Sequence, residues 1–371
     1  MRSLLVLLTL LGTMSASAQS SYYLFVGTYT SGKSEGIYVY RFNAQRGIAT
    51  AVSKATGIEN PSYLAISPDH RFVYAVSENS SKAGEVVAFS FDKAKGVLTL
   101  LNRQPAGNGP CYVTTDSTGR FVVVAEYGGG SIRVFRTNTD GSLQPASQVI
   151  EHEGYGIVYE RQDKSHVHAV VFSPDQKYLF APDLGNDRLY QYRFNPNEPT
   201  SPLSPAENPY YTLPDGSGPR HFTFHPNGQT AYLINELTGE VVAYQYSNGQ
   251  LQEIQTIAST TVGGKYEKGS ADIHVSPNAK FLFTSNRGKA NDIAIYLLSK
   301  DGKLNKTGQQ PVNEHPRNFV IDPTGKFLLV ASKNNHSIQV FSINPNFGLL
   351  EDTGQKIEVD SPVCLKMIPA K

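Results

Sequence analysis

The sequence contains no tryptophan, only two cysteines, and only 18% charged residues. Its formal net charge of +1 excludes the broad basic surface of a nucleic-acid-binding protein and a solvating acidic tail, so any charged ligand has to be recognised by a local cluster of residues. The remaining composition, 39% hydrophobic residues in a chain of 371, is that of an ordinary folded protein with a large buried core.

Long hydrophobic runs are also missing. The N-terminal run, Leu4 to Leu11, is too short for a membrane helix, which needs roughly 20 apolar residues. One arginine precedes this run, and the small residues Ala16-Ser17-Ala18 follow it. This pattern predicts a signal peptide over residues 1–18 that is cleaved after Ala18, and a mature protein that is periplasmic or secreted and no longer bound to a membrane.

Glycine and proline are plentiful, with 32 and 22 copies, and they punctuate an internal repeat of about fifty residues. Each repeat has an apolar strand, a tight turn, a second apolar strand and then a third strand of alternating polarity. The six strand–turn–strand segments are YLAISPDHRFVYAVSE, YVTTDSTGRFVVVAE, AVVFSPDQKYLFAPD, FTFHPNGQTAYLINE, IHVSPNAKFLFTSN and FVIDPTGKFLLVAS. A weaker fourth strand follows each unit, which is typical of a β-propeller blade.

A seventh repeat is divided between the two ends of the chain. YYLFVGTY and GIYVYRF supply its middle strands, and SPVCLKMIPA near the C-terminus resembles the inner strand of the other units. Joining the first and last strands in one blade closes the ring and removes exposed sheet edges. We therefore predict an all-β fold, a seven-bladed β-propeller with four-stranded antiparallel blades, as a single domain over residues 19–371. Cys111 and Cys364 fall in inner strands two blades apart, so we expect both thiols to be free.

The repeat register places particular residues at the end of each hairpin opposite its turn, beside the central channel. The start of the inner strand is occupied by Ser62, Cys111, His168, Arg220, Ala271, Arg317 and Val363. The end of the second strand is occupied by Tyr29, Glu78, Tyr127, Leu184, Glu236, Arg287 and Lys333, with Glu126, Asp183, His221, Asp272 and Asn286 at neighbouring positions. A charged cluster on three consecutive blades predicts a ligand pocket, although a water-filled channel also favours polar residues and an Arg–Glu pair can be purely structural.

Several of these stretches together resemble the seven-bladed propeller lactonase family, which includes bacterial 6-phosphogluconolactonases and the fungal enzyme that cyclises carboxymuconate. The matching stretches include LFVGTYT, YGGGSIRVF, RQDKSHVHAVVFSPD, GPRHFTFHPNG, INELTGEVVAYQY, IHVSPNAKFLFTSNRG and PRNFVIDPTGKFLLVAS. The resemblance implies that the catalytic residues are His168, Arg220, Glu236 and Arg287. The other polar residues around the channel mouth are expected to bind substrate: His166, His221, Asp183, Arg317, Lys333, Tyr29 and Glu78.

These residue types suit lactone hydrolysis. A histidine with an ordinary pKa of about 6.5 can act as acid or base near neutrality. Arginines can hold a carboxylate or phosphate, or stabilise an oxyanion. Glu236 could orient Arg220 or His168, or act as the base itself, and the sequence leaves these roles open.

We expect no metal and no cofactor. His166 and His168 are one residue apart, so in a regular strand they would point to opposite faces, and no third histidine is placed to join them. The expected partner is a small lactone, with no nucleic acid, and a monomer is expected. Two alternatives stay open: a muconate-type lactonising cycloisomerase, and a non-catalytic exported propeller that binds a glycan or protein ligand on the same face.

Overall fold

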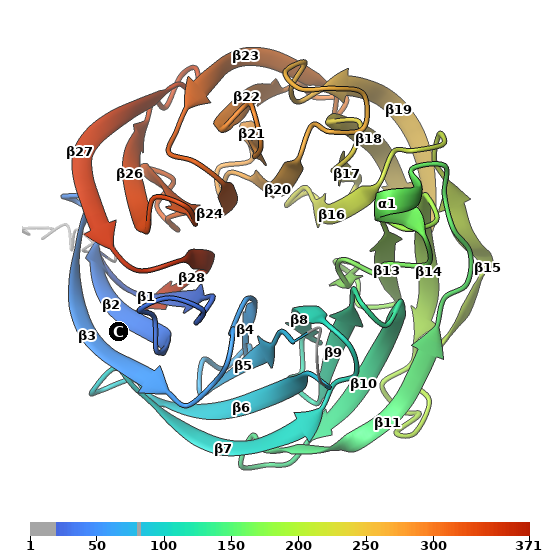
Figure 1. Ribbon diagram of the computed structural model, residues 1–371, viewed down its shortest axis with the longest axis horizontal. Helices are drawn as coiled ribbons and strands as arrows, with labels where there is room; N and C mark the ends of the chain where they lie inside the picture. The colour runs from blue at the N-terminus through green and yellow to red at the C-terminus, as the bar shows by residue number, and fades with distance from the viewer. Residues whose placement is uncertain (1–19, 80–82) are drawn as a thin grey trace, which may run out of the picture.

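The structure, a computed structural model, describes residues 20–79 and 83–371. It contains seven four-stranded antiparallel sheets arranged as blades around a central channel (Figure 1). The predicted seven-bladed propeller is confirmed. The predicted signal peptide, residues 1–18, lies outside the described residues.

Each blade runs from an inner strand beside the channel to an outer strand at the rim. Blades 1 to 3 contain, from inner to outer strand, β28 (Pro362–Pro369), β1 (Ser21–Thr28), β2 (Gly36–Asn43) and β3 (Ile48–Thr56); β4 (Leu64–Ile66), β5 (Phe72–Ser77), β6 (Glu85–Asp92) and β7 (Val97–Pro105); β8 (Pro110–Thr115), β9 (Phe121–Glu126), β10 (Ser131–Thr137) and β11 (Leu143–Glu151). Blades 4 and 5 contain β12 (Val171–Phe172), β13 (Tyr178–Asp183), β14 (Arg188–Phe194) and β15 (Leu203–Thr212); β16 (Pro219–Phe224), β17 (Thr230–Asn235), β18 (Glu240–Ser247) and β19 (Gln250–Ala258). Blades 6 and 7 contain β20 (Ser270–Val275), β21 (Phe281–Asn286), β22 (Asp292–Leu298) and β23 (Leu304–Pro311); β24 (Pro316–Ile321), β25 (Phe327–Ser332), β26 (Ser337–Ile343) and β27 (Leu350–Glu358). A short helix, α1 (Tyr159–Gln162), lies in the connection between blades 3 and 4.

The second strand of each blade is buried on both faces. All six residues of β9, FVVVAE, and all six of β25, FLLVAS, are buried. β-branched and aromatic side chains suit this position because they fill the space between neighbouring sheets. The outer strands face solvent, and β7 has only one fully buried residue. This gradient explains why the second strand of each repeat is easy to recognise in the sequence and the fourth is weak.

The ring is closed by the C-terminal strand, as predicted. β28 pairs antiparallel with β1, from Tyr22 opposite Pro369 to Thr28 opposite Pro362. Gly27 lies at an irregularity in this pairing, and a Cβ atom there would come within 2.3 Å of the carbonyl oxygen of Pro61. The close approach of Pro61, which precedes the inner strand of blade 2, to β1 therefore requires glycine at this position.

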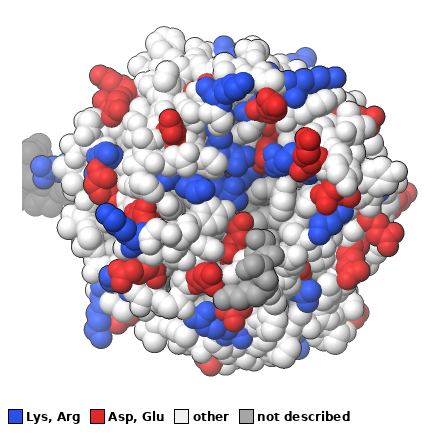
Figure 2. Space-filling view, viewed as in Figure 1, with Lys and Arg blue, Asp and Glu red and all other residues white. Residues whose placement is uncertain are grey.

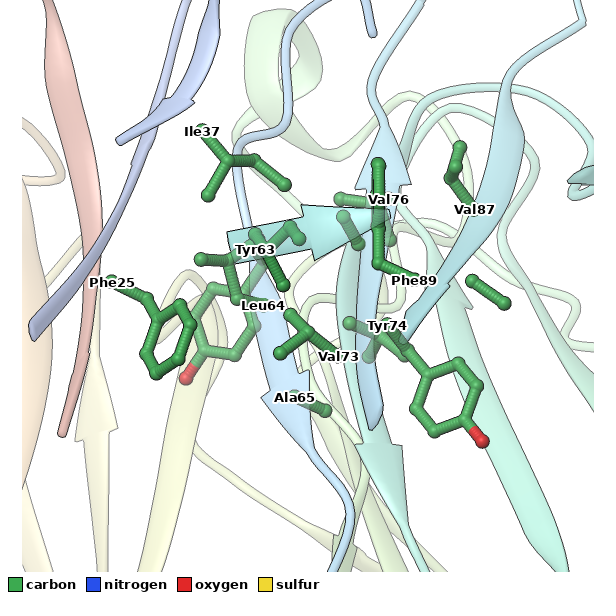
Figure 3. Close-up of a cluster of buried hydrophobic side chains, with 14 of the residues drawn as sticks. Phe25, Ile37, Tyr63, Leu64, Ala65, Val73, Tyr74, Val76, Val87 and Phe89 are labelled. Atoms are coloured by element: carbon green, nitrogen blue, oxygen red, sulfur yellow. The ribbon is translucent and has the colours of Figure 1, made fainter. Parts of the chain in front are cut away.

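Aromatic and branched side chains fill the spaces between blades. Figure 3 shows the cluster of blades 1 and 2, in which Phe25, Leu64, Val73 and Phe89 converge. Phe91 meets the ring of Phe25 edge to face, with the two ring centroids 4.9 Å apart. Burying one such side chain stabilises the fold by about 1.5–3 kcal/mol.

Both cysteines are buried and free, as predicted. Cys111 lies on β8 and Cys364 on β28, where its sulfur lies 3.3 Å from the backbone nitrogen of Leu64. No helix in the described part of the chain has the length and apolar character needed to cross a lipid bilayer.

Candidate active site at the channel mouth

The charged residues at the ends of the hairpins opposite the turns meet at one mouth of the channel. Nε of Arg220 on β16 lies 2.9 Å from Oε2 of Glu236, which directly follows β17. Nη2 of Arg287, which follows β21 in the next blade, lies 2.8 Å from the same oxygen. Figure 2 shows Lys and Arg side chains gathered around the central hollow of this face. The structure thus brings together three of the four residues predicted to be catalytic.

Glu236 is only 4% exposed and is surrounded by arginines. Burial alone would raise the pKa of its carboxyl group, but Arg287, Arg161 and Arg220 hold that pKa well below its usual value. Both carboxylate oxygens have arginine partners. A carboxylate in this environment is a weak base near neutral pH, so its chemistry favours orienting the arginines over accepting a proton from water.

Arg161 is a site residue that our reading of the sequence missed. It belongs to α1, and its Nη2 lies 2.5 Å from Oε1 of Glu236. The Arg161 side chain is 41% exposed, whereas the side chains of Arg220 and Arg287 are 2% and 10% exposed. The connection between blades 3 and 4, which contains Arg161, is not part of the fifty-residue repeat. The repeat register therefore could not predict where Arg161 lies. The only signal was an arginine five residues before the first histidine of the His-x-His segment.

Backbone carbonyls fix the two buried guanidinium groups. Nη1 of Arg220 donates to the carbonyl oxygen of Ala271, and Nε of Arg287 donates to that of Gly269 at 3.0 Å. Burial lowers the pKa of both groups, yet a guanidinium still carries its charge near neutrality. Within the described residues, Nη2 of Arg220 and Nη1 of Arg287 have no hydrogen-bond acceptor. These N–H groups are free to bind an oxygen of a ligand.

His168 also lies at the channel, but not in a regular strand. Residues 166–170 come before β12, and the backbone nitrogen of His168 donates to the carbonyl oxygen of Pro182 on β13 at 3.0 Å. Pro182 has no N–H to complete the pair, which explains the local break in the ladder. Burial and the charge of Arg220 hold the pKa of His168 well below its usual value, so its imidazole is neutral at pH 7.

The expected opposition of His166 and His168 does not hold in this irregular segment. The ring of His166 stacks on Tyr127, with the centroids 4.3 Å apart, and the ring of His168 meets Tyr127 edge-on at 5.4 Å. The two nitrogens of His166 are occupied by the carbonyl oxygen of Tyr127 at 2.8 Å and the carboxylate of Asp163 at 3.0 Å. Of these two histidines, only His168 has a ring nitrogen, Nε2, without a partner among the residues that the structure describes.

Cys111 lies beside His168, with its sulfur 3.9 Å from Nδ1 of the imidazole. Burial raises the pKa of the thiol to about 12, so the sulfur stays protonated. Its contacts with the carbonyl oxygens of Val167 and His168 are those of a structural thiol.

Four of the predicted substrate-binding residues line the other side of the mouth. The guanidinium of Arg317 and the ammonium of Lys333, both from blade 7, lie 5.7 and 5.3 Å from the ring centre of Tyr29. The Tyr29 hydroxyl donates to Glu78 at 3.0 Å. Neither Arg317 nor Lys333 has a carboxylate within ion-pair distance in the described part of the chain. Burial and then the nearby cations, Arg287 followed by Arg317 and Lys333, lower the pKa of His315 to about 3.

Asp183 and His221 are engaged in contacts within the protein. Asp183 is fully buried, and its oxygens accept from Nδ1 of His152 at 2.9 Å and from the backbone nitrogens of His166 and Gly185 at 2.7 and 3.0 Å. Its contacts therefore hold the loops around His166. The ring of His221 lies between Arg220 and Asp272 and has both nitrogens occupied.

The segment from Gly27 to Gly36 matches two further motifs that our reading of the sequence passed over. GTYTSGKS has the spacing of a phosphate-binding loop, and GKSEG has that of a nucleophile elbow. In the structure the segment joins β1 to β2, and no helix follows it. The backbone nitrogen of Ser34 donates to the carboxylate of Asp360, so the anion that this loop binds is a side chain of the protein. Neither motif has the strand-to-helix context that its chemistry requires.

The described residues contain no group of three His, Cys, Asp or Glu side chains placed to hold a metal ion. On the side of Glu236, this mouth presents neutral His168 and the free N–H groups of Arg220 and Arg287 to a ligand. Together they suit an uncharged oxygen that becomes negative during a reaction.

Comparisons with known proteins identify the family of this chain. A family model described as "Lactonase, 7-bladed beta-propeller" matches residues 23–367. The chain is 37% identical over 352 residues to the 6-phosphogluconolactonase of Formosa agariphila, covering 93% of this chain and 99% of that protein. It is 33% identical to the 6-phosphogluconolactonase of Bacillus subtilis, covering 94% of this chain and 99% of that protein. The solved structure of the periplasmic gluconolactonase of Pseudomonas aeruginosa is similar with a TM-score of 0.91 and 36% identity, covering 95% of this chain and all of that one.

Proposed function

Because this chain belongs to the seven-bladed β-propeller lactonase family, we propose that it is a carboxylic ester hydrolase that opens the ring of a sugar lactone. The observation that carries this proposal is the meeting of Arg220, Arg287 and neutral His168 at one channel mouth. Hydrolysis of a lactone needs a base for the attacking water, donors for the oxyanion and an acid for the departing alkoxide. This mouth supplies all three.

In the proposed reaction, Nε2 of His168 accepts a proton from the water that attacks the lactone carbonyl. The lowered pKa makes each of these groups a weaker base than usual, but Nε2 of His168 has no partner among the described residues, whereas both oxygens of Glu236 are bound by arginines. The free N–H groups of Arg220 and Arg287 bind the oxygen that becomes negative in the tetrahedral intermediate. The ring C–O bond then breaks, and protonated His168 returns the proton to the departing alkoxide. The product is an open hydroxy acid, and no cofactor takes part in these steps.

The cationic side of the mouth, with Arg317 and Lys333, binds the rest of the substrate. Its unpaired charges suit a lactone with a phosphate or carboxylate group, and the hydroxyl groups of a neutral sugar lactone can also accept hydrogen bonds from them. The relatives include both 6-phosphogluconolactonases and a periplasmic gluconolactonase. We therefore leave the phosphorylated and the unphosphorylated sugar lactone as the two candidate substrates.

We further propose that the protein acts outside the cytoplasmic membrane. The N-terminal pattern of residues 1–18 and the likeness to a periplasmic gluconolactonase support this location. N-terminal sequencing of protein recovered from the periplasm or medium should begin at Gln19. Protein that stays in the cytoplasm with Met1 intact would overturn this proposal and leave the lactonase function standing.

The direct test of function is lactone opening by the mature protein, residues 19–371, at neutral pH. δ-Gluconolactone and 6-phosphogluconolactone are the first substrates to compare, with spontaneous hydrolysis subtracted because δ-lactones open unaided. We expect turnover well above that background, and a chelator should not abolish it. Tight binding of a lactone without turnover would instead favour a binding propeller, and formation of a lactone from a muconate would favour a cycloisomerase.

A further inference from the structure

The guanidinium of Arg220 is held from two sides, and the second side involves residues with no role in the proposed reaction so far. On the first side, Nε donates to Glu236. On the second side, Nη1 lies 3.1 Å from Nε2 of His221, the next residue in the chain. Nδ1 of His221 in turn lies 2.7 Å from Oδ1 of Asp272 on β20. This contact sets the tautomer: Nδ1 carries the proton, and the lone pair on Nε2 accepts from Arg220.

Asp272 is 1% exposed, and every one of its partners is a donor. Oδ2 accepts hydrogen bonds from Nε2 of His274 at 2.9 Å and from the side-chain amide of Asn318. The backbone nitrogens of Ile273 and Phe319 also donate to the carboxylate, at 3.1 and 3.3 Å. Burial alone would raise the pKa of this carboxyl group, but its histidine partners hold that pKa well below the usual value. Asp272 is therefore a fixed, charged acceptor.

The partners of this carboxylate come from three neighbouring inner strands. His221 lies on β16, Asp272 and His274 on β20, and Asn318 on β24. The side-chain oxygen of Asn318 also accepts from the backbone nitrogen of Leu365 on β28, the strand that closes the ring. The network thus ties the orientation of His221 to the wall of the channel across four blades.

We propose that Asp272 is a positioning residue, which acts through His221 to hold the guanidinium of Arg220 at the angle that the reaction needs. His274 and Asn318 hold Asp272 itself. His221 is thereby assigned to positioning, not to substrate contact, because both of its ring nitrogens are occupied within the protein. The catalytic part of this inference rests on the lactonase function proposed above, and the geometric part does not.

The physical reason for two-sided support is the shape of the guanidinium. Nε donates to Glu236 and one N–H of Nη1 donates to the carbonyl oxygen of Ala271, so His221 is the third contact of the group. Loss of this third contact lets the plane tilt, and a tilt changes the direction of Nη2, the N–H group left for the oxyanion. Stabilisation of an oxyanion depends steeply on the position of its donors, so an error of about 1 Å can cost about a hundredfold in rate.

Two substitutions of His221 separate the two halves of the network. His221→Asn keeps a donor near Asp272 but removes the acceptor for Arg220, whereas His221→Gln can place its oxygen near Nη1 of Arg220 but leaves Asp272 short of one donor. If positioning of Arg220 is the role, kcat falls by about tenfold to a hundredfold in His221→Asn with little change in KM, and His221→Gln, which restores the acceptor but not its support by Asp272, recovers only part of the loss. A role in stability alone predicts the reverse order, because Asp272 is the buried charge that needs its donors.

The second readout needs no substrate. In protein labelled with ¹⁵N-arginine, the side-chain resonances of Arg220 are identified by their loss in Arg220→Lys. We expect separate, slowly exchanging Nη signals in the wild type, broadening in His221→Asn and Asp272→Asn, and partial recovery in His221→Gln. His152→Gln is the matched control, since it breaks another buried His–Asp pair, with side chains 1% and 0% exposed, and should leave the Arg220 signals unchanged.

The two readouts distinguish the possible failures. If the Arg220 signals change as expected but the wild type opens no lactone, the geometric network holds and the proposed function fails. Wild-type turnover combined with unchanged Arg220 signals and unchanged kcat in His221→Asn would overturn this inference and leave the lactonase function intact.

Discussion

The two ends of each inner hairpin differ in how far their residues vary from blade to blade. At the turn end, one arrangement recurs from blade to blade: the residue before the turn accepts from the backbone nitrogen that starts the second strand. Examples are Ser67 with Phe72, Asp116 with Phe121, Ser173 with Tyr178, Ser276 with Phe281 and Asp322 with Phe327, at distances of 2.6–3.0 Å. At the channel mouth, equivalent positions hold residues as different as Leu184, Glu236 and Arg287. The residues at the turn end stabilise the same turn in blade after blade, whereas the residues at the mouth differ between blades.

This division has an electrostatic consequence. The turns pair their polar groups locally, within a few residues, whereas the mouth brings buried charges together from separate blades. The carboxylate of Glu236 has arginine partners 16, 51 and 75 residues away in the sequence. We therefore expect changes at the mouth to affect the reaction and its pH dependence, and changes at the turns to affect stability.

The largest expected effect is that of Arg220→Lys at the mouth. Lysine keeps the positive charge beside Glu236 but loses the planar fork and its free N–H group, so kcat/KM for lactone opening should fall by roughly a hundredfold or more. The circular dichroism spectrum should show the fold unchanged. Lys177→Ala, in an exposed turn, is the matched control and should keep wild-type turnover. Equal rates for Arg220→Lys and the wild type would contradict the expectation that changes at the mouth affect the reaction.

The second prediction concerns acid. His168 has its pKa lowered in the folded protein, so below pH 6.5 the unfolded chain binds a proton that the folded chain does not. Stability is therefore lost as the pH falls through this range, by at most about 2 kcal/mol at pH 5 for one histidine that stays neutral in the folded state. Glu236 and Asp272 are mostly charged in both states above about pH 5, so the interval from pH 6.5 to 5 reports mainly on histidines.

Urea unfolding at pH 7 and pH 5 measures this difference. The His168→Gln variant has one fewer buried imidazole, so its free energy of unfolding should decline less than that of the wild type over the same interval. Parallel declines in the two proteins would show that His168 does not stay neutral in the folded state.

The third prediction tests the turn end. Asp322 is fully buried and accepts from the backbone nitrogens of Thr324, Lys326 and Phe327 at 2.9, 2.8 and 2.6 Å. Asp322→Ala leaves these donors without a partner, which should lower the free energy of unfolding by about 1.5 kcal/mol. Turnover at 25 °C should stay unchanged. A loss of turnover larger than the loss of folded protein would contradict the separation of scaffold and site.

The smallest effect is expected for Arg161→Ala. Arg161 is the most exposed of the three arginines on Glu236, and an exposed ion pair contributes about 0.2–1 kcal/mol. We expect a loss of about threefold to fivefold in kcat/KM, with Arg220 and Arg287 still in place. A hundredfold loss would place Arg161 among the groups that contact the reacting atoms, and steady-state kinetics on both candidate lactones would decide between these outcomes.

The sequence predicts the propeller well because each repeat of about fifty residues corresponds to one blade. The register also places Arg220, Glu236 and Arg287 correctly at one mouth, since a hairpin brings residues sixteen apart to the same end. It could not place Arg161, whose connection belongs to no repeat. Nor could it show that His221 is enclosed by Asp272, because that contact joins neighbouring blades across 51 residues. The break at His168 depends on Pro182 in the facing strand, and strand alternation alone does not reveal it.

The closing pair of strands sets the order of events when the protein is made. β1 is among the first strands to be synthesised, yet its partner on the channel side, residues 362–369, is the last. Until those residues are available, one edge of β1 has unpaired backbone groups that can join another chain. Contacts between residues so far apart in sequence also form slowly. The ring therefore cannot close before residues 362–369 are available, and a chain that lacks them has an unpaired edge on β1.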